Sequence, residues 1–149
     1  MEQCNEIRNW INAVLKEMSE LNGTKGESIL EKCGLNCANH SGVLDEVKEV
    51  RNKLPPGATI DEIFDIYKHE IYKDSPRLQK KGDTIILEYN KCECQMGIMF
   101  EDIDPFLCNC TRGYSKNIFE LLFDTSVDAT IEKSILKGDD ICRVVIRIK

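Results

Sequence analysis

Apolar side chains recur at helical intervals along the first half of the chain. The clearest run alternates steps of four and three residues, and its members are Ile7, Ile11, Val14, Met18 and Leu21. That spacing aligns side chains along one stripe of an α-helix and predicts a helix over residues 5–21. Such a stripe can face the core or a second copy of the chain, so a homodimer interface is one interpretation of it.

Three more helices are predicted before residue 75. Two of them open on a threonine with a glutamate three residues later, which is the spacing of a capping box: Thr24 with Glu27, and Thr59 with Glu62. The helix after Thr24 is predicted to run to Cys37, and the helix after Thr59 to end before residue 75. A third helix follows residue 41 and ends at residues 55–57, because proline cannot continue the hydrogen-bond ladder.

The hydrophobic period changes to two in the second half of the chain. Three segments alternate apolar and polar side chains and are predicted strands: residues 84–89, 127–132 and 142–148. A turn at residues 137–140 would join the last two as an antiparallel hairpin. We also expect a turn at residues 80–83, a strand over residues 96–100 and a helix over residues 115–123.

Helices and strands are therefore gathered in separate halves of the chain. The helical half covers residues 1–73 and the strand-rich half, which contains the cysteine pairs, covers residues 82–149. This segregation predicts a single α+β domain, with N-terminal helices packed on a mostly antiparallel sheet and an inserted helix near the C-terminus. A length of 149 residues, 42% of them hydrophobic, suffices for one core.

Charge and hydropathy narrow the classes of partner. A formal net charge of -6 opposes binding to nucleic acid or to an anionic membrane surface. Charged residues interrupt every apolar segment well before the roughly 20 residues that a membrane-spanning helix needs. The acidic, polar first residues do not resemble a secretory signal. We expect a cytoplasmic protein with no nucleic acid and no membrane partner.

Cysteine is abundant in the chain, and its thiols are the first candidates for a functional site. Eight cysteines occupy positions 4, 33, 37, 92, 94, 108, 110 and 142. Without an export signal, reduced thiols or metal ligands are favoured over a disulfide framework, which stays open as the alternative for a secreted protein.

The spacing of these cysteines suits metal ligation. Cys33, Cys37 and His40 lie four and three residues apart, so they share one side of a helix. Cys92 and Cys94 follow a predicted strand with both thiols on one side, and Cys108 and Cys110 repeat the spacing. Zinc takes four thiolate or imidazole ligands, and two ligand pairs distant in sequence can close such a site.

Burial is the alternative explanation for each thiol. Cysteine packs as a small hydrophobe, and Cys4 and Cys142 are expected to lie in the core. For Cys33 and Cys37, core packing and ligation are equally supported. The two C-x-C pairs stand in polar surroundings, which favours a ligand or a reactive thiol over core packing.

The C-terminal part of the chain also resembles a known group of proteins. The residues that carry the resemblance are the segment 108–113, with its C-x-C pair, and the segment 134–142, in which a glycine-acidic turn leads to Cys142. Over about the last 65 residues the chain resembles 4-vinyl reductase-type domains and the related L-2-amino-thiazoline-4-carboxylate hydrolase-like bacterial proteins. The resemblance implies a small-molecule-binding module, with Cys108, Cys110 and Cys142 as metal ligands.

Three hypotheses for the function follow. The first is a zinc-binding module that holds or senses a small-molecule ligand, with Cys92, Cys94, Cys108 and Cys110 as ligands and Cys33, Cys37 and His40 as substitutes. The second is a cysteine-dependent hydrolase of a small heterocycle or amide, with His40 or His69 as the base. The third is a structural or interaction protein in which the cysteines only pack.

Overall fold

The computed structural model describes residues 2–149, with side chains from Asn5 onward. Its α-helices are α1 (Glu2–Ser19), α2 (Lys25–Ser41), α3 (Val43–Asn52), α4 (Ile60–Tyr72), α5 (Gln95–Met99) and α6 (Cys108–Phe123). Its strands are β1 (Leu78–Lys81), β2 (Thr84–Tyr89), β3 (Val127–Lys133) and β4 (Cys142–Ile148). Two short 3-10 helices, η1 (Pro105–Leu107) and η2 (Ile135–Lys137), lie in the connections.

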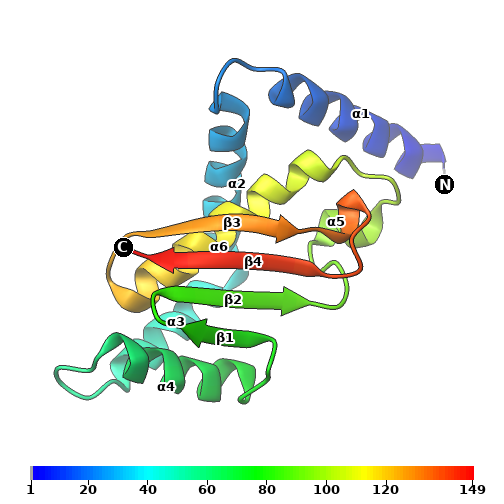
Figure 1. Ribbon diagram of the computed structural model, residues 1–149. Coiled ribbons are helices and arrows are strands. Elements are labelled where there is room, and N and C mark those ends of the chain that lie inside the picture. The colour runs from blue at the N-terminus through cyan, green and yellow to red at the C-terminus, as the bar shows by residue number, and fades with distance from the viewer. Residues whose placement is uncertain (1) are drawn as a thin grey trace.

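The four strands form one antiparallel sheet in the order β1-β2-β4-β3. Figure 1 shows α3 and α6 running behind this sheet and α4 beside its β1 edge. The main core lies between the inner face of the sheet and these three helices; its fully buried members include Tyr67, Ile85, Phe119, Leu122 and Ile146. The predicted α+β class, the strands at residues 84–89, 127–132 and 142–148, and the antiparallel hairpin are confirmed.

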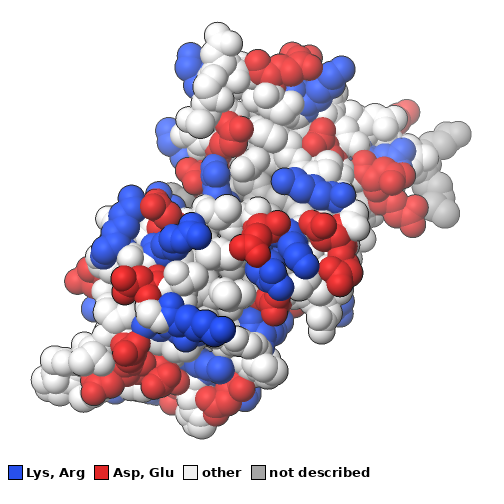
Figure 2. Space-filling view, viewed as in Figure 1, with Lys and Arg blue, Asp and Glu red and all other residues white. Residues whose placement is uncertain are grey.

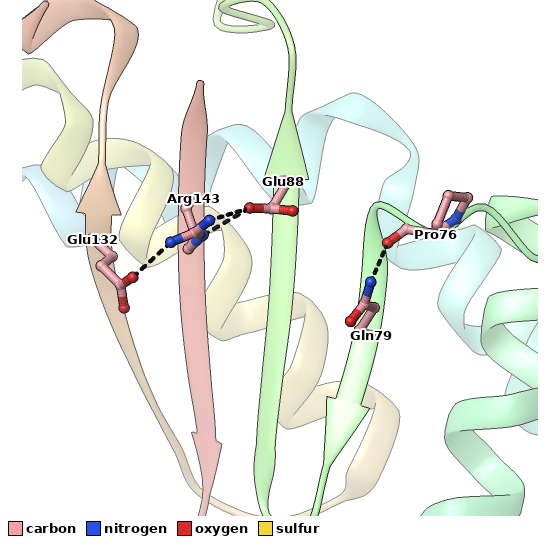
Figure 3. Close-up of polar contacts among 5 residues, drawn as sticks. All are labelled: Pro76, Gln79, Glu88, Glu132 and Arg143. Carbon is pink, nitrogen blue, oxygen red and sulfur yellow. Dashed lines mark hydrogen bonds and ion pairs between the residues drawn. The ribbon is translucent and has the colours of Figure 1, made fainter. Parts of the chain in front are cut away.

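The outer face of the sheet is held by ion pairs instead of a helix layer. The side chain of Arg143 on β4 reaches glutamates on both neighbouring strands (Figure 3). Its Nη2 lies 2.7 Å from Glu88 Oε2 on β2, and its Nη1 lies 3.0 Å from Glu132 Oε1 on β3. Over the face seen in Figure 2, basic and acidic side chains are interspersed, and no large patch of one sign forms.

Helix boundaries follow local chemistry in most places. The capping box of α4 is present, with Thr59 Oγ1 accepting from Glu62 N–H at 3.2 Å and Glu62 Oε2 accepting from Thr59 N–H at 3.0 Å. The capping box predicted at Thr24 is wrong, because that side chain makes no cap hydrogen bond. Helix α2 still begins after Thr24, and it runs past Cys37 to Gly42, whose φ of 85° ends it.

One predicted element is wrong, and two are present with different bounds. The segment expected to be a strand at residues 96–100 is the short helix α5. Lys80 and Lys81 belong to β1 and leave only Gly82 and Asp83 to turn; β1 is three-quarters polar, and of its side chains only Leu78 is fully buried. The inserted helix begins at Cys108 and not at residue 115, since its polar first turn gives no amphipathic signal.

Helix α1 packs less deeply than its stripe predicts. Leu15 is buried in a second, smaller core with Leu30 and Leu107, whereas Ile7 is 51% and Trp10 68% exposed. Asn12 anchors the helix to the loop before η1, donating to the Asp102 carbonyl at 2.9 Å and accepting from Asp104 N–H at 2.8 Å. The exposed side chains of the stripe are available for contact with a second copy of the chain, and the homodimer interface stays a prediction. Among the described residues, no helix is long and apolar enough to cross a membrane.

Helices α2 and α6 touch backbone to backbone. The face of α2 toward the interior carries Gly26, Leu30, Gly34 and Ala38, four residues apart and all buried. A Cβ built on Gly34 would lie 1.9 Å from the carbonyl oxygen of Cys110, and one on Gly113 would lie 2.2 Å from the carbonyl oxygen of Glu31. Only glycine fits at these two positions, so the crossing depends on both.

We expect Gly34→Ala to lower the free energy of unfolding by about 1–3 kcal/mol, the usual cost of overpacking. The loss should appear although alanine has the higher helix propensity, because the added methyl group must push α2 away from α6. Urea denaturation followed by circular dichroism measures it. Asn36→Ala, on the exposed side of the same helix, is the matched control, and equal stability of the two variants would contradict the close contact.

Candidate functional site

Seven cysteines with described side chains come from four separate segments. Cys33 and Cys37 lie on α2, Cys92 and Cys94 in the segment between β2 and α5, Cys108 and Cys110 in the first turn of α6, and Cys142 at the start of β4. None of them is in a disulfide. We call these seven residues the thiol cluster. Cys4, predicted to pack in the core, lies outside the described side chains.

Cys110 is the centre of one half of the cluster. Burial is the largest cause that raises the pKa of its thiol, and Cys94, Cys37, Cys33 and Cys108 raise it further, in falling order. The α2–α6 contact explains why the α2 thiols act on Cys110. Gly34 touches the Cys110 carbonyl, and Cys33 directly precedes Gly34 in the chain. An ion pair between Arg112 and Glu31, with a distance of 3.0 Å, ties the same two helices together.

Cys108 is the centre of the other half. Two residues on a helix are separated by about 200° of rotation, so Cys108 and Cys110 point to different sides of α6. Cys108 Sγ shares a hydrogen bond with the buried Ser134 Oγ at 3.1 Å. Burial is the largest cause that raises the pKa of Cys108, and the thiols of Cys142 and Cys92 also raise it. Cys108 and Cys110 repeat the C-x-C spacing of Cys92 and Cys94, but they lie on a helix and not in an extended segment, so their side chains do not share one side.

The second C-x-C pair is placed by the turn that leads into α5. Cys94 is the N-cap of α5 with extended backbone angles, and a Cβ on Gly97 would lie 2.4 Å from Cys92 Sγ. The helix thus folds back over the Cys92 thiol, and glycine is needed to leave room for the sulfur. Cys94 joins the half around Cys110, while Cys92 also lies near Cys142.

Cys142 was expected to lie in the core, but it is a member of neither hydrophobic core cluster. It is half-buried, and its Sγ accepts a hydrogen bond from the Ile135 N–H at 3.4 Å. Cys33 and Cys37, in contrast, are exposed, so their core-packing interpretation is wrong. His40 is exposed one turn beyond Cys37, in the last turn of α2.

Burial keeps the central thiols protonated. It raises the pKa of Cys92 and of Cys108, and together with the neighbouring thiols it raises the pKa of Cys110 to about 12. A bound cation would reverse this balance, because it stabilises the thiolates that burial and mutual repulsion disfavour. Within the described part of the chain, no three ligand side chains already stand at metal-binding positions, so the thiols would have to turn toward an ion.

A nucleophilic Cys–His pair finds less support in this geometry. A raised pKa lowers the thiolate fraction that nucleophilic attack needs. His69 lies on α4, where its Nδ1 is 2.8 Å from Asp74 Oδ2 at an exposed site. Its partner is a carboxylate and not a thiol.

Sequence reasoning missed the residues that assemble the cluster. Gly34, Gly97 and Gly113 each make room for a neighbouring atom, and Ser134 holds Cys108. Glycine in the interior of a helix, next to cysteine in Cys33-Gly34 and close to it in Cys110-Thr111-Arg112-Gly113, is the signal that could have revealed the helix contact.

Comparison with known proteins places the chain in a family. The model of a family of unknown function, DUF6144, matches residues 1–149, and the chain belongs to this family. No curated protein matches the chain. The resemblance of the C-terminal part to 4-vinyl reductase-type domains stays a prediction.

We expect alkylation of the reduced, metal-free protein to follow exposure and pKa. At pH 8 a thiol with a pKa of about 12 is about 10⁻⁴ ionised, so Cys110 should react long after the exposed Cys33 and Cys37. Its rate should still rise tenfold per pH unit above pH 9, where ordinary thiols level off. Iodoacetamide labelling read by peptide mass spectrometry tests this, with the urea-unfolded chain as control. Reaction of Cys110 ahead of Cys33 would contradict the arrangement.

Proposed function

We propose that the chain is a zinc-binding module that holds or senses a small molecule, with Cys33, Cys37, Cys94 and Cys110 as the zinc ligands. The observation that carries the proposal is the close contact of α2 with the first turn of α6, where Gly34 touches the carbonyl of the half-buried Cys110. In agreement with it, the thiols of Cys94, Cys37 and Cys33 add to the effect of burial in raising the pKa of Cys110. A structural zinc site takes four ligands, and four cysteine thiolates are one of the sets that form it.

The two halves of the thiol cluster differ in their hydrogen bonds. Cys108 is bonded to Ser134, and Cys142 accepts from Ile135 N–H. Among the described residues, no hydrogen bond reaches Cys110 Sγ. Cys94 and Cys110 both pack against the smaller core, and a half-buried sulfur without a hydrogen bond gains most from a shared cation, so the half around Cys110 is the better zinc site.

Zinc bound at these four thiols would tie together the elements that the chain brings to this point. It would link α2, the segment before α5 and the first turn of α6. Zinc binding requires thiolates, so each ligand loses its proton when the ion enters. The affinity should therefore rise with pH over the neutral range, since the raised pKa of Cys110 keeps that thiol protonated in the metal-free state.

Support for the small-molecule part comes from two hollows near the thiol cluster. Glu93, which stands between Cys92 and Cys94, lines both of them. A ligand there would therefore contact the segment that supplies one zinc ligand.

We expect the reduced protein to bind one equivalent of zinc and to lose that site in Cys110→Ser and Cys94→Ser. Competition against a chromophoric chelator measures affinity and stoichiometry, and zinc should also raise the melting temperature by mass action. Cys142→Ser, in the other half of the cluster, is the matched control and should keep the site.

Three results would contradict this assignment. Absence of zinc binding by the reduced protein would overturn the proposal as a whole. Loss of zinc in Cys142→Ser but not in Cys110→Ser would move the site to the half around Cys108. Elemental analysis of protein purified without added metal could find iron instead of zinc. That result would contradict the choice of metal but not the choice of ligands.

A further inference from the structure

All four tyrosines of the chain line one cavity. Its volume is about 150 Å³, and it lies beneath the sheet between β2, α3, α4 and α6. The tyrosines come from three different helices or strands and are Tyr67, Tyr72, Tyr89 and Tyr114. No spacing in the sequence links these four positions, so the cavity is a product of the fold.

The cavity has apolar walls and a small polar lining. Leu87, Ile118 and Phe119 form much of the wall, and the Phe119 ring packs edge-on against Tyr67 at 5.9 Å between centroids. Hydrophobic cavities of about this volume bind molecules of the size of benzene. A compact aromatic or cyclic body therefore fits the space.

An ion pair stands at the mouth of the cavity. Arg77 Nη1 lies 3.2 Å from Glu93 Oε1, and both side chains are nearly half exposed. The Arg77 guanidinium also lies over two of the tyrosine rings, 5.0 Å from the centroid of Tyr72 and 5.5 Å from that of Tyr89. A guanidinium held in this way is already oriented to receive a planar anion.

The same ion pair connects the cavity with an open groove. Arg77 and Glu93 line both, and the groove has a volume of about 710 Å³. Figure 3 shows part of its wall, where Gln79 donates to the Pro76 carbonyl and Glu88 is held by Arg143. A ligand can approach along this groove and meet Arg77 before it enters the cavity.

Charge in the groove favours an anion. The two carboxylates that line the groove already have cationic partners: Glu88 pairs with Arg143, and Glu93 pairs with Arg77. Lys91 also lines the groove, and among the described residues it has no carboxylate partner within ion-pair distance. An entering carboxylate would be attracted by Lys91 and would compete with the half-exposed Glu93 for Arg77.

We propose that the cavity binds a small aromatic carboxylate, with the ring among the tyrosines and the carboxylate on Arg77 in place of Glu93. This inference rests on the small-molecule part of the proposed function and does not require the zinc site. Burial raises the pKa of Tyr67, Tyr72 and Tyr89, so the phenols stay protonated and can donate to ligand oxygens.

Displacement of Glu93 links this cavity to the thiol cluster. The chain neighbours of Glu93 are Cys92 and Cys94, and Cys94 is one of the proposed zinc ligands. A ligand that frees Glu93 changes the restraints on the segment that holds Cys94. Ligand and zinc should therefore alter each other's affinity by the same factor, as linkage requires.

Isothermal titration calorimetry with three probes tests the inference: benzoate, its neutral analogue benzamide and the cation benzyltrimethylammonium. We expect benzoate to bind at least about tenfold more tightly than benzamide, because it alone supplies a charge for Arg77. Arg77→Gln should remove this preference and leave benzamide binding nearly unchanged. Arg147→Gln, an exposed arginine on β4 outside both hollows, is the matched control and should behave as wild type.

The titrations are run on metal-free and on zinc-loaded protein, which separates the two proposals. Arginine-dependent benzoate binding in the metal-free protein supports the cavity even if no zinc binds. Zinc binding without benzoate binding at millimolar concentration overturns the cavity inference alone. Tighter binding of the ammonium probe would overturn the anion assignment, and equal benzoate affinities with and without zinc would overturn the linkage.

Discussion

The contact between the backbones of α2 and α6 is the constraint on which the thiol cluster depends. Gly34 and Gly113 let the two helices approach until main-chain atoms touch. Any side chain at these positions would separate the helices and move the thiols of α2 away from Cys110. The cluster therefore depends on two residues that carry no chemistry of their own.

Helix α6 connects the chemically distinct parts of the molecule. Its first turn directs Cys110 toward α2 and Cys108 toward Ser134 and Cys142. Further along, the same helix supplies Tyr114, Ser115, Ile118 and Phe119 to the wall of the tyrosine cavity. The segment with Cys92, Glu93 and Cys94 reaches from the mouth of that cavity to the thiols. One helix and one short segment thus place a thiol-rich site and a ligand-sized cavity side by side.

The sequence predicts the fold better than it predicts the site. A hydrophobic period near two revealed β2, β3 and β4, and the threonine–glutamate spacing revealed the start of α4, because these signals are local. The first turn of α6 was missed since residues 108–112 are mostly polar, and β1 was missed since it buries only Leu78. Both elements are held by contacts with distant residues, which no local pattern records.

The grouping of the cysteines could not be predicted for the same reason. Spacing paired Cys92 with Cys94 and Cys108 with Cys110, but in the structure the principal grouping crosses these pairs. Helical geometry divides Cys108 from Cys110, and the α2–α6 contact adds Cys33 and Cys37 to the Cys110 half. The tyrosines were not singled out at all, because residues 67, 72, 89 and 114 share a cavity only after folding.

X-ray absorption spectroscopy at the zinc edge, on reduced protein loaded with one equivalent of zinc, tests the central claim most directly. If zinc draws Cys33, Cys37, Cys94 and Cys110 together as proposed, its first shell should hold four sulfur atoms at about 2.3 Å and no nitrogen or oxygen ligand. A shell dominated by nitrogen and oxygen would contradict it, since the half of the cluster around Cys110 would then not be what holds the metal.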